Sequence, residues 1–189
     1  MKYGIIVIGS SLGGLKALRA VLSSLHGDLN IPVVIVQHRS ADADDTLRLL
    51  LQRDCLLLVQ EVEDKMQMLP GKVYLAPGGY HLMVEKDHFE LSVDDVVNHA
   101  QPSIDVLFET AANSFGACTI GVVLTGTGKD GAQGLAKIEH YGGVVLVESP
   151  DDAFASEMPN AAITATQNAI QLRLDEMGPY LMDLSFKQK

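Results

Sequence analysis

Short apolar runs alternate along the chain with segments in which apolar residues recur at helical spacing. The runs, rich in Val and Ile, cover Tyr3–Ile8, Ile31–Gln37, Thr119–Thr125 and Gly143–Glu148. The segments of helical spacing cover Leu12–Leu25, Asp45–Asp54, Ser103–Ser114 and Gly131–Tyr141. Continuous apolar runs are typical of strands buried on both faces of a parallel sheet. Strands joined through helices therefore predict an α/β fold, with a doubly wound, mainly parallel sheet flanked by helices.

The stretch from residue 56 to residue 97 departs from this alternation. Turn residues at Pro77-Gly78-Gly79 and Lys86-Asp87 separate short runs, which predict strands at Val73–Ala76, Tyr80–Glu85 and His88–Val93. This spacing predicts a β-hairpin or meander excursion over about residues 70–97. The chain ends in a predicted strand, Ile170–Leu174, and a closing helix. Because the sequence shows no linker and no repeat, we expect one domain over residues 1–189.

Charge and hydropathy narrow the classes of partner. The chain carries 24 acidic and 14 basic residues, a net charge of −10, which argues against nucleic acid and anionic membrane as partners. No run approaches the roughly 20 apolar residues of a membrane span, and the first apolar run is too short for a signal peptide. Cys55 and Cys118 lie in apolar segments without a C-x-x-C pattern, which predicts two buried, reduced thiols. We therefore expect a cytoplasmic protein that does not insert into a membrane.

A glycine-rich turn follows the first predicted strand. Gly9-Ser10-Ser11-Leu12-Gly13 fits the G-x-S-x-G spacing, which exposes a serine hydroxyl where a strand turns into a helix. The free N–H groups at the start of that helix can hold an oxyanion. A turn that binds phosphate, or nothing, is the plainer alternative. The spacing is not G-x-G-x-x-G, no Gly-Lys-Ser/Thr element follows, and the second strand ends in Gln37-His38 rather than an acid, which argues against dinucleotide and P-loop sites.

Three residues with complementary chemistry follow three of the predicted strands. Ser11, His38 and Asp130 would meet at the carboxyl edge of the sheet, where open α/β sheets bind ligands. A serine hydroxyl needs an imidazole to take its proton, and the imidazole needs a carboxylate to orient it. The alternatives are a structural histidine at His38 and an N-cap at Asp130 for the helix that begins at Gly131, a role that Asp130 can combine with catalysis. Ser103, after Pro102, is the predicted cap of its own helix.

Cofactor and metal sites find no support in the sequence. No His, Asp or Glu pair has the helical ligand spacing of H-E-x-x-H, so we expect neither a metal nor a cofactor. The order serine, histidine, acid also differs from the serine, acid, histidine order of α/β-hydrolases. The serine turn therefore does not indicate a standard member of that fold.

At these residues the sequence resembles the catalytic domain of the CheB family, the chemotaxis protein-glutamate methylesterases. The resemblance covers almost the whole chain, and its motifs are Ile8-Gly9-Ser10-Ser11-Leu12-Gly13-Gly14, Val36-Gln37-His38, Leu69-Pro70-Gly71, Tyr74-Leu75-Ala76-Pro77-Gly78, Pro102-Ser103-Ile104-Asp105-Val106-Leu107-Phe108, Leu124-Thr125-Gly126-Thr127-Gly128-Lys129-Asp130-Gly131-Ala132 and Met158-Pro159-Asn160-Ala161-Ala162. It implies a cytoplasmic serine hydrolase that removes methyl groups from glutamyl esters on the cytoplasmic helices of methyl-accepting chemoreceptors and releases methanol. Deamidation of glutamine is implied as a related reaction.

The resemblance places the catalytic residues on Ser11, His38 and Asp130. We expect the oxyanion to be held by backbone N–H groups of Leu12 or Gly13, with one from the loop at Thr127. A related acyl hydrolase or deamidase that acts on a non-chemotactic protein stays open as an alternative. A non-catalytic docking domain is a third hypothesis, and the retained triad argues against it.

Several positions depart from the family pattern. Leu12 replaces a threonine beside the nucleophile, Thr127 a common methionine, and Gln101 a common arginine. Full-length relatives also carry an N-terminal receiver domain that blocks the site until it is phosphorylated. Since this chain starts on the first predicted strand, we expect a stand-alone relative or an excised domain, whose activity does not respond to phosphodonors. A separate regulatory protein is a candidate partner.

Overall fold

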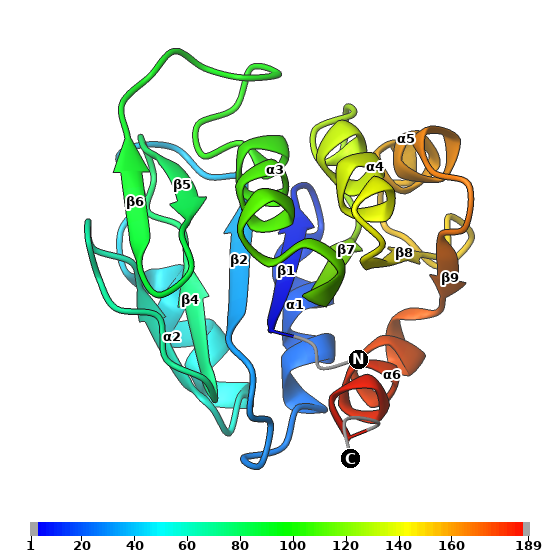
Figure 1. The fold of residues 1–189 in the computed structure, drawn as a ribbon, viewed down its shortest axis with the longest axis horizontal. Helices are drawn as coiled ribbons and strands as arrows, with labels where there is room; N and C mark the ends of the chain where they lie inside the picture. Colours follow the sequence, from blue (N-terminus) through cyan, green and yellow to red (C-terminus); the bar gives the residue numbers. More distant parts are fainter. Residues whose placement is uncertain (1–3, 187–189) are drawn as a thin grey trace.

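A seven-stranded parallel sheet forms the centre of the computed structural model, which describes residues 4–186 (Figure 1). Its order is β3-β4-β2-β1-β7-β8-β9, and every pairing in it is parallel. In that spatial order the strands span Leu58–Glu61, Lys72–Leu75, Val33–Gln37, Ile5–Ser10, Thr119–Val123, Val144–Glu148 and Ile170–Leu172. The strands β5 (His81–Val84) and β6 (Phe89–Ser92) form a separate antiparallel hairpin. The predicted doubly wound α/β fold is confirmed.

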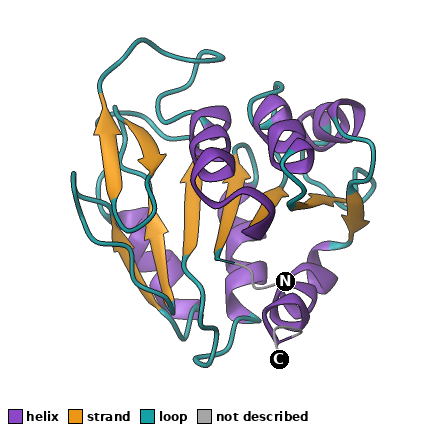
Figure 2. Cartoon of the chain, viewed as in Figure 1, coloured by secondary structure: helices purple, strands orange, loops and turns teal. Residues whose placement is uncertain are grey.

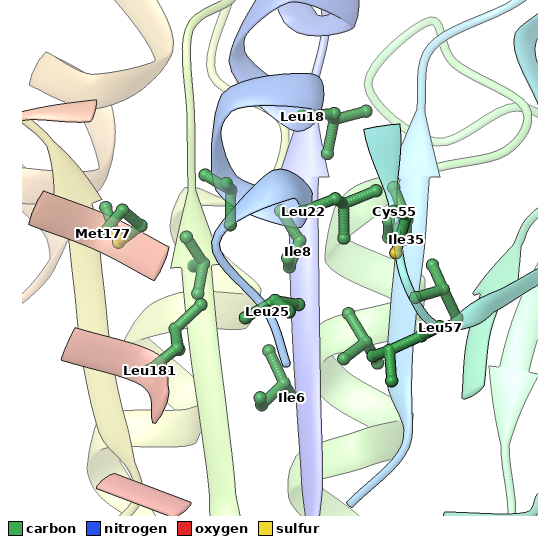
Figure 3. Close-up of a cluster of buried hydrophobic side chains, with 14 of the residues drawn as sticks. Ile6, Ile8, Leu18, Leu22, Leu25, Ile35, Cys55, Leu57, Met177 and Leu181 are labelled. Atoms are coloured by element: carbon green, nitrogen blue, oxygen red, sulfur yellow. The ribbon is translucent and has the colours of Figure 1, made fainter. Parts of the chain in front are cut away.

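Helices cover both faces of the sheet (Figure 2). One face carries α1 (Gly14–Ser23), α2 (Thr46–Asp54) and α6 (Leu174–Phe186), and the other carries α3 (Ile104–Phe115), α4 (Ala132–His140) and α5 (Glu157–Ala165); a short 3-10 helix, Gly116–Cys118, precedes β7. Alternate residues of β1 enter the two cores, Ile6 and Ile8 under α1 and Ile5 and Val7 under α3. Figure 3 shows Leu18 and Leu22 of α1, with Leu25 just after the helix, packed over β1. Both faces of the strand are buried, which is why its sequence is continuously apolar.

Several elements differ from the prediction. The segment predicted as the first strand of a meander, Val73–Ala76, forms β4 inside the main sheet, where Val73, Tyr74 and Leu75 are buried. Only β5 and β6 form the predicted excursion. The sequence analysis missed the edge strand β3, whose Leu-Val-Gln-Glu sequence is only partly buried, and the helix α5. Pairing with partner strands decides which sheet a strand joins, so local pattern does not reveal the place of β3 and β4.

The topology brings three strand ends together. From β1 the chain moves to β2 on one side, and later returns through α3 to β7 on the other side of β1 (Figure 1). Such a reversal opens a crevice at the carboxyl ends of the strands, which is the usual ligand site of open α/β sheets. Within residues 4–186, no helix is long and apolar enough to cross a membrane.

Candidate active site

Ser11 lies on the turn between β1 and α1. The N–H of Ser11 donates to the carbonyl of Thr125 on the β7 side (3.0 Å), and the N–H of Gly14 donates back to the Ser11 carbonyl (2.9 Å). Gly13 adopts a left-handed conformation with φ of 84°, which L side chains rarely tolerate. The tight turn therefore needs glycine at this position, and it leaves the Ser11 side chain at the surface of the crevice.

His38 stands beside Ser11 because β1 and β2 are paired in register. Ser10 faces Gln37 in the ladder, and the N–H of His38 continues it by donating to the Ser10 carbonyl (3.0 Å). The ring atom Nδ1 lies 3.2 Å from Ser11 Oγ, and Nε2 lies 2.8 Å from Asp130 Oδ2. Because the carboxylate can only accept, the ring N–H belongs on Nε2, which leaves Nδ1 to accept the serine proton.

Gln37 ties these two residues together. Its side-chain amide Nε2 donates to the carbonyls of Ser11 (2.9 Å) and His38 (3.1 Å), and its Oε1 accepts from Ser10 Oγ (2.8 Å). A Cβ atom on Gly14 would lie only 1.9 Å from Gln37 Oε1, so glycine at position 14 makes room for this amide. One side chain thus fixes the serine turn to the strand end that carries the histidine.

Asp130 is held at the N-terminus of α3, far from it in sequence. The side chain is 3% exposed, and Oδ2 accepts from the N–H of Ile104 (2.7 Å) as well as from His38. Oδ1 accepts from Ser103 Oγ (2.9 Å) and from the N–H of Asp105 (3.1 Å). A carboxylate at this helix end satisfies otherwise free N–H groups and interacts favourably with the helix dipole.

Burial by itself raises the pKa of Asp130, but the hydrogen bonds that it accepts outweigh this effect. Among these hydrogen bonds, that with His38 lowers the pKa most, followed by those from the N–H groups of Ile104 and Asp105 and from the hydroxyl of Ser103. The net result is a pKa below the ordinary value of Asp. The carboxylate therefore stays ionised while it orients His38.

These contacts correct one prediction and extend another. Ser103 occupies the predicted N-cap position of α3, but its hydroxyl donates to Asp130 instead of capping the helix, and the Asp130 carboxylate accepts from the first N–H groups of α3. Asp130 also accepts from the N–H of Gly131 (3.1 Å), at the start of α4. The carboxylate thus caps α3 and binds His38, and it also binds the N-cap residue that precedes α4, although no described side chain caps α4 itself.

A second acid lies behind Asp130. Asp105, which is 5% exposed, accepts from the N–H of Gly134 (2.7 Å) and from Asn98 Nδ2 (2.7 Å). The same Asn98 amide donates to Asp130 Oδ1 (3.2 Å) and so bridges the two carboxyl groups. Burial is the main reason that the pKa of Asp105 is raised, and the charge of Asp130 adds to it.

A pocket of about 770 Å³ opens above Ser11 and His38. Leu12, 52% exposed, and Phe154, 74% exposed, form apolar parts of its lining, and Thr127 also lines it. Phe154 lies directly over Gly13, where an added Cβ would come within 2.8 Å of it. A methyl ester fills only a small part of this volume, so the pocket has room for the residues around the target group.

Backbone donors at the pocket remain free. Within residues 4–186, the N–H groups of Leu12, Gly13 and Thr127 make no hydrogen bond to protein atoms. All three residues line the same pocket as Ser11. Free N–H groups beside a nucleophile are what stabilisation of an oxyanion requires.

The structure brings together the six site residues that the sequence predicted. Ser11, His38 and Asp130 form one hydrogen-bonded chain, and Leu12, Gly13 and Thr127 line the pocket beside it. The sequence analysis did not identify Asn98 or Phe154, which carry no local motif, and it gave Gln37 and Asp105 no role beyond their place in the motifs.

Among the described residues no group of three or more His, Cys, Asp or Glu side chains could hold a metal ion. Cys55 is buried, as predicted, whereas Cys118 is only partly buried, and both are free thiols.

Comparisons with known proteins agree on one family. The CheB methylesterase family model matches residues 6–181. A protein of Leptospira interrogans, provisionally named protein-glutamate methylesterase/protein-glutamine glutaminase, is 43% identical over 97% of this chain and 96% of its own length. A Thermotoga maritima protein with that enzyme name is 37% identical over 84% of this chain, which spans about half (47%) of that protein. The crystal structure of the Thermotoga maritima CheB methylesterase catalytic domain matches with a TM-score of 0.92 at 33% identity, over 97% of this chain and 100% of that one.

Proposed function

The chain belongs to the CheB methylesterase family, and from that premise we propose that it hydrolyses glutamyl methyl esters on chemoreceptors through Ser11, His38 and Asp130. The observation that carries the assignment of the residues is the chain of contacts from Ser11 Oγ to His38 Nδ1 (3.2 Å) and from His38 Nε2 to Asp130 (2.8 Å). The substrate that we propose is the cytoplasmic helical region of a methyl-accepting chemoreceptor.

The first half of the reaction acylates the serine. His38 Nδ1 takes the proton of Ser11 as Oγ attacks the ester carbonyl and forms a tetrahedral oxyanion. The free N–H groups of Leu12 or Gly13, with that of Thr127, stabilise the oxyanion. When the intermediate collapses, the C–O bond to the methoxy group breaks, and the leaving oxygen takes the proton from Nδ1 and departs as methanol.

The second half releases the product. Nδ1 takes a proton from water, whose oxygen attacks the glutamyl-serine ester. Collapse breaks the bond to Ser11 Oγ, which recovers its proton from Nδ1, and leaves a glutamate side chain. Asp130 remains ionised in both halves and keeps the Nε2–H directed toward it, which fixes the tautomer that the serine needs.

Hydrolysis of glutamine side chains is a second reaction of the same site. The relatives from Leptospira interrogans and Thermotoga maritima carry the glutaminase name beside the esterase name. An amide enters the same steps, except that the nitrogen takes the proton from Nδ1 and leaves as ammonia. Because the amide nitrogen is a poorer leaving group than the methoxy oxygen of an ester, we expect this reaction to be slower than ester hydrolysis.

Methanol release from a methylated chemoreceptor fragment tests the proposal. We expect wild-type protein to release methanol and the Ser11→Ala variant to release none above background. Ser23→Ala, which changes an exposed serine at the end of α1, is the matched control and should behave as wild type. Release by Ser11→Ala at the wild-type rate would refute the role of Ser11. Activity on an esterified non-receptor protein but not on the receptor would favour the alternative substrate instead.

A further inference from the structure

Three neighbouring hollows surround the triad at the carboxyl edge of the sheet. The pocket above Ser11 lies against His38, and a second hollow of about 520 Å³ also has His38 in its wall. A third, of about 560 Å³, shares Val96 and His99 with the second and extends to Lys129. Together they form a surface much larger than the scissile group, which we call the catalytic rim.

The charge of the catalytic rim is opposite to that of the whole chain. The walls of the three hollows contain four basic residues and no Asp or Glu, the basic residues being Lys16, Arg19, Arg39 and Lys129. The chain as a whole carries 24 acidic against 14 basic residues. A positive surface at the active site of an acidic protein favours a partner with negative charge.

Two of these cations are free to meet such a partner. Arg19 pairs with Asp54, and Arg39 pairs with Glu61 at 2.7 Å, so their charges are largely compensated. Lys16 and Lys129 are exposed, and neither forms an ion pair with any residue from 4 to 186, although the charge of Lys16 acts at longer range on the buried Glu148. Lys16 lines the pocket above Ser11, and Lys129 lines the third hollow, so the two lie in different parts of the rim.

Exposed apolar side chains line the same hollows as these lysines. Leu12 and Phe154 line the pocket above Ser11, and Val96, 59% exposed, lines both other hollows. Apolar groups in water beside free cations fit a segment that has both an apolar and an acidic face.

We propose that the catalytic rim is a docking surface for an acidic, amphipathic segment of the protein substrate that flanks the target residue, with Lys16 and Lys129 binding its carboxylates. This inference rests on the proposed function, since it assumes that a protein carries the ester. Both proposed reactions leave a carboxylate where a neutral side chain stood, so each turnover makes the segment more acidic.

Charge reversal combined with a salt series tests the proposal. For Lys16→Glu and Lys129→Glu we expect kcat/KM for methanol release from a methylated receptor fragment to fall about tenfold each at low ionic strength, mainly through KM. At roughly 0.5 M salt, where exposed charges are screened beyond a few ångströms, the difference from wild type should shrink to less than about twofold. Lys16→Glu is the deciding variant, because Lys129 adjoins Asp130.

Lys86→Glu is the matched control. Lys86 is exposed in the turn of the β5–β6 hairpin, near residues 30–32 at the amino edge of the sheet, and the same change of charge there should leave kcat/KM unaltered. An effect of Lys16→Glu no larger than that of Lys86→Glu, or a loss that salt does not relieve, would overturn the docking surface. Wild-type protein that hydrolyses neither the receptor fragment nor a small neutral ester would instead overturn the proposed function.

Discussion

The two ends of the triad lie in opposite environments. Asp130 is 3% exposed and accepts hydrogen bonds from N–H groups at the start of α3, from the N–H of Gly131, and from the side chains of His38, Ser103 and Asn98. Ser11 stands in an open pocket beside two exposed apolar side chains and free N–H groups. The permanent charge of the Asp130 carboxylate is buried and hydrogen-bonded on both oxygens. The charge of the oxyanion, which forms only during the reaction, instead meets N–H donors that have no other partner within residues 4–186.

Electrostatics explains the difference. A buried carboxylate is stable only when hydrogen bonds replace the water it loses, so the donors at the start of α3 must be in place before Asp130 can be buried in its ionised form. An oxyanion exists only for a moment, and donors that another partner already occupied could not stabilise it. Asp130, the inner end of the triad, should therefore affect folding as well as catalysis. Ser11 and the pocket around it, the outer end, should affect catalysis alone.

Ser11→Ala should produce the largest loss of activity with the smallest structural cost. We expect turnover to fall roughly 10⁴-fold or more, because the nucleophile is lost. The melting temperature should stay within about 1 °C of wild type, because the hydroxyl is only partly buried and its one contact with a described side chain is with His38. Methanol release and thermal unfolding measure the two effects. A Ser11→Ala protein that melts several degrees lower would break the division between the two ends.

Asp130→Asn should reduce both activity and stability. Turnover should fall about 10³- to 10⁴-fold, because an amide cannot fix the His38 tautomer in the same way. The new NH₂ group faces N–H donors, which should cost about 2 kcal/mol, or about 5 °C in melting temperature for a chain of this size. Loss of activity with wild-type stability would show that the contacts at the start of α3 contribute little to folding.

The stability cost of Asp130→Asn should depend on pH. The pKa of Asp130 is lowered in the folded state, so its contribution is complete above the ordinary Asp value of about 3.9 and disappears as the pH falls through the lower folded value. The gap in melting temperature between wild type and variant should therefore be widest near pH 7 and close below about pH 4. A gap that stayed constant over this range would contradict the assignment.

Phe154→Ser should affect the outer end only. Since Phe154 is 74% exposed and covers Gly13 at the pocket, we expect kcat/KM for the receptor fragment to fall about three- to fivefold, with a melting temperature within about 1 °C of wild type. Phe186→Ser, which removes another exposed phenylalanine at the end of α6, is the control and should leave kinetics unchanged. Equal effects of the two changes would argue against a role for Phe154 at the pocket.

Glu148→Gln should have the smallest effect, and it should raise the melting temperature where Asp130→Asn lowers it. Glu148 is buried, burial is the main reason that its pKa is raised, and it accepts from the N–H of Thr125 at 2.7 Å. A raised folded pKa makes the wild type gain stability as the pH falls, whereas Gln keeps an acceptor for Thr125 without the charge. The variant should melt about 1–3 °C higher near pH 8, and this gain should vanish near pH 4. A variant less stable than wild type at pH 8 would contradict this account.

Local pattern determined much of this protein. The apolar runs predicted the strands β1, β2, β7 and β8 to within one or two residues at most ends, because strands buried on both faces must be apolar throughout. Chain order and the position of strand ends also predicted that Ser11, His38 and Asp130 meet. That prediction needs only a parallel sheet, whose carboxyl ends lie on one edge.

Other features depend on contacts between distant segments. Whether β4 joins the hairpin or the main sheet is decided by its pairing with β2 and β3, and Asp130 caps α3 because the loop after β7 folds back onto Ser103 and Ile104. The choice of His38 nitrogen, the Asn98 bridge and the charge of the rim arise in the same way. The sequence by itself determined which chemical groups face the crevice, since that follows from local periodicity and strand direction. Only the tertiary structure decided which donors satisfy each group, because hydrogen bonds and charge compensation depend on distances between residues far apart in the chain.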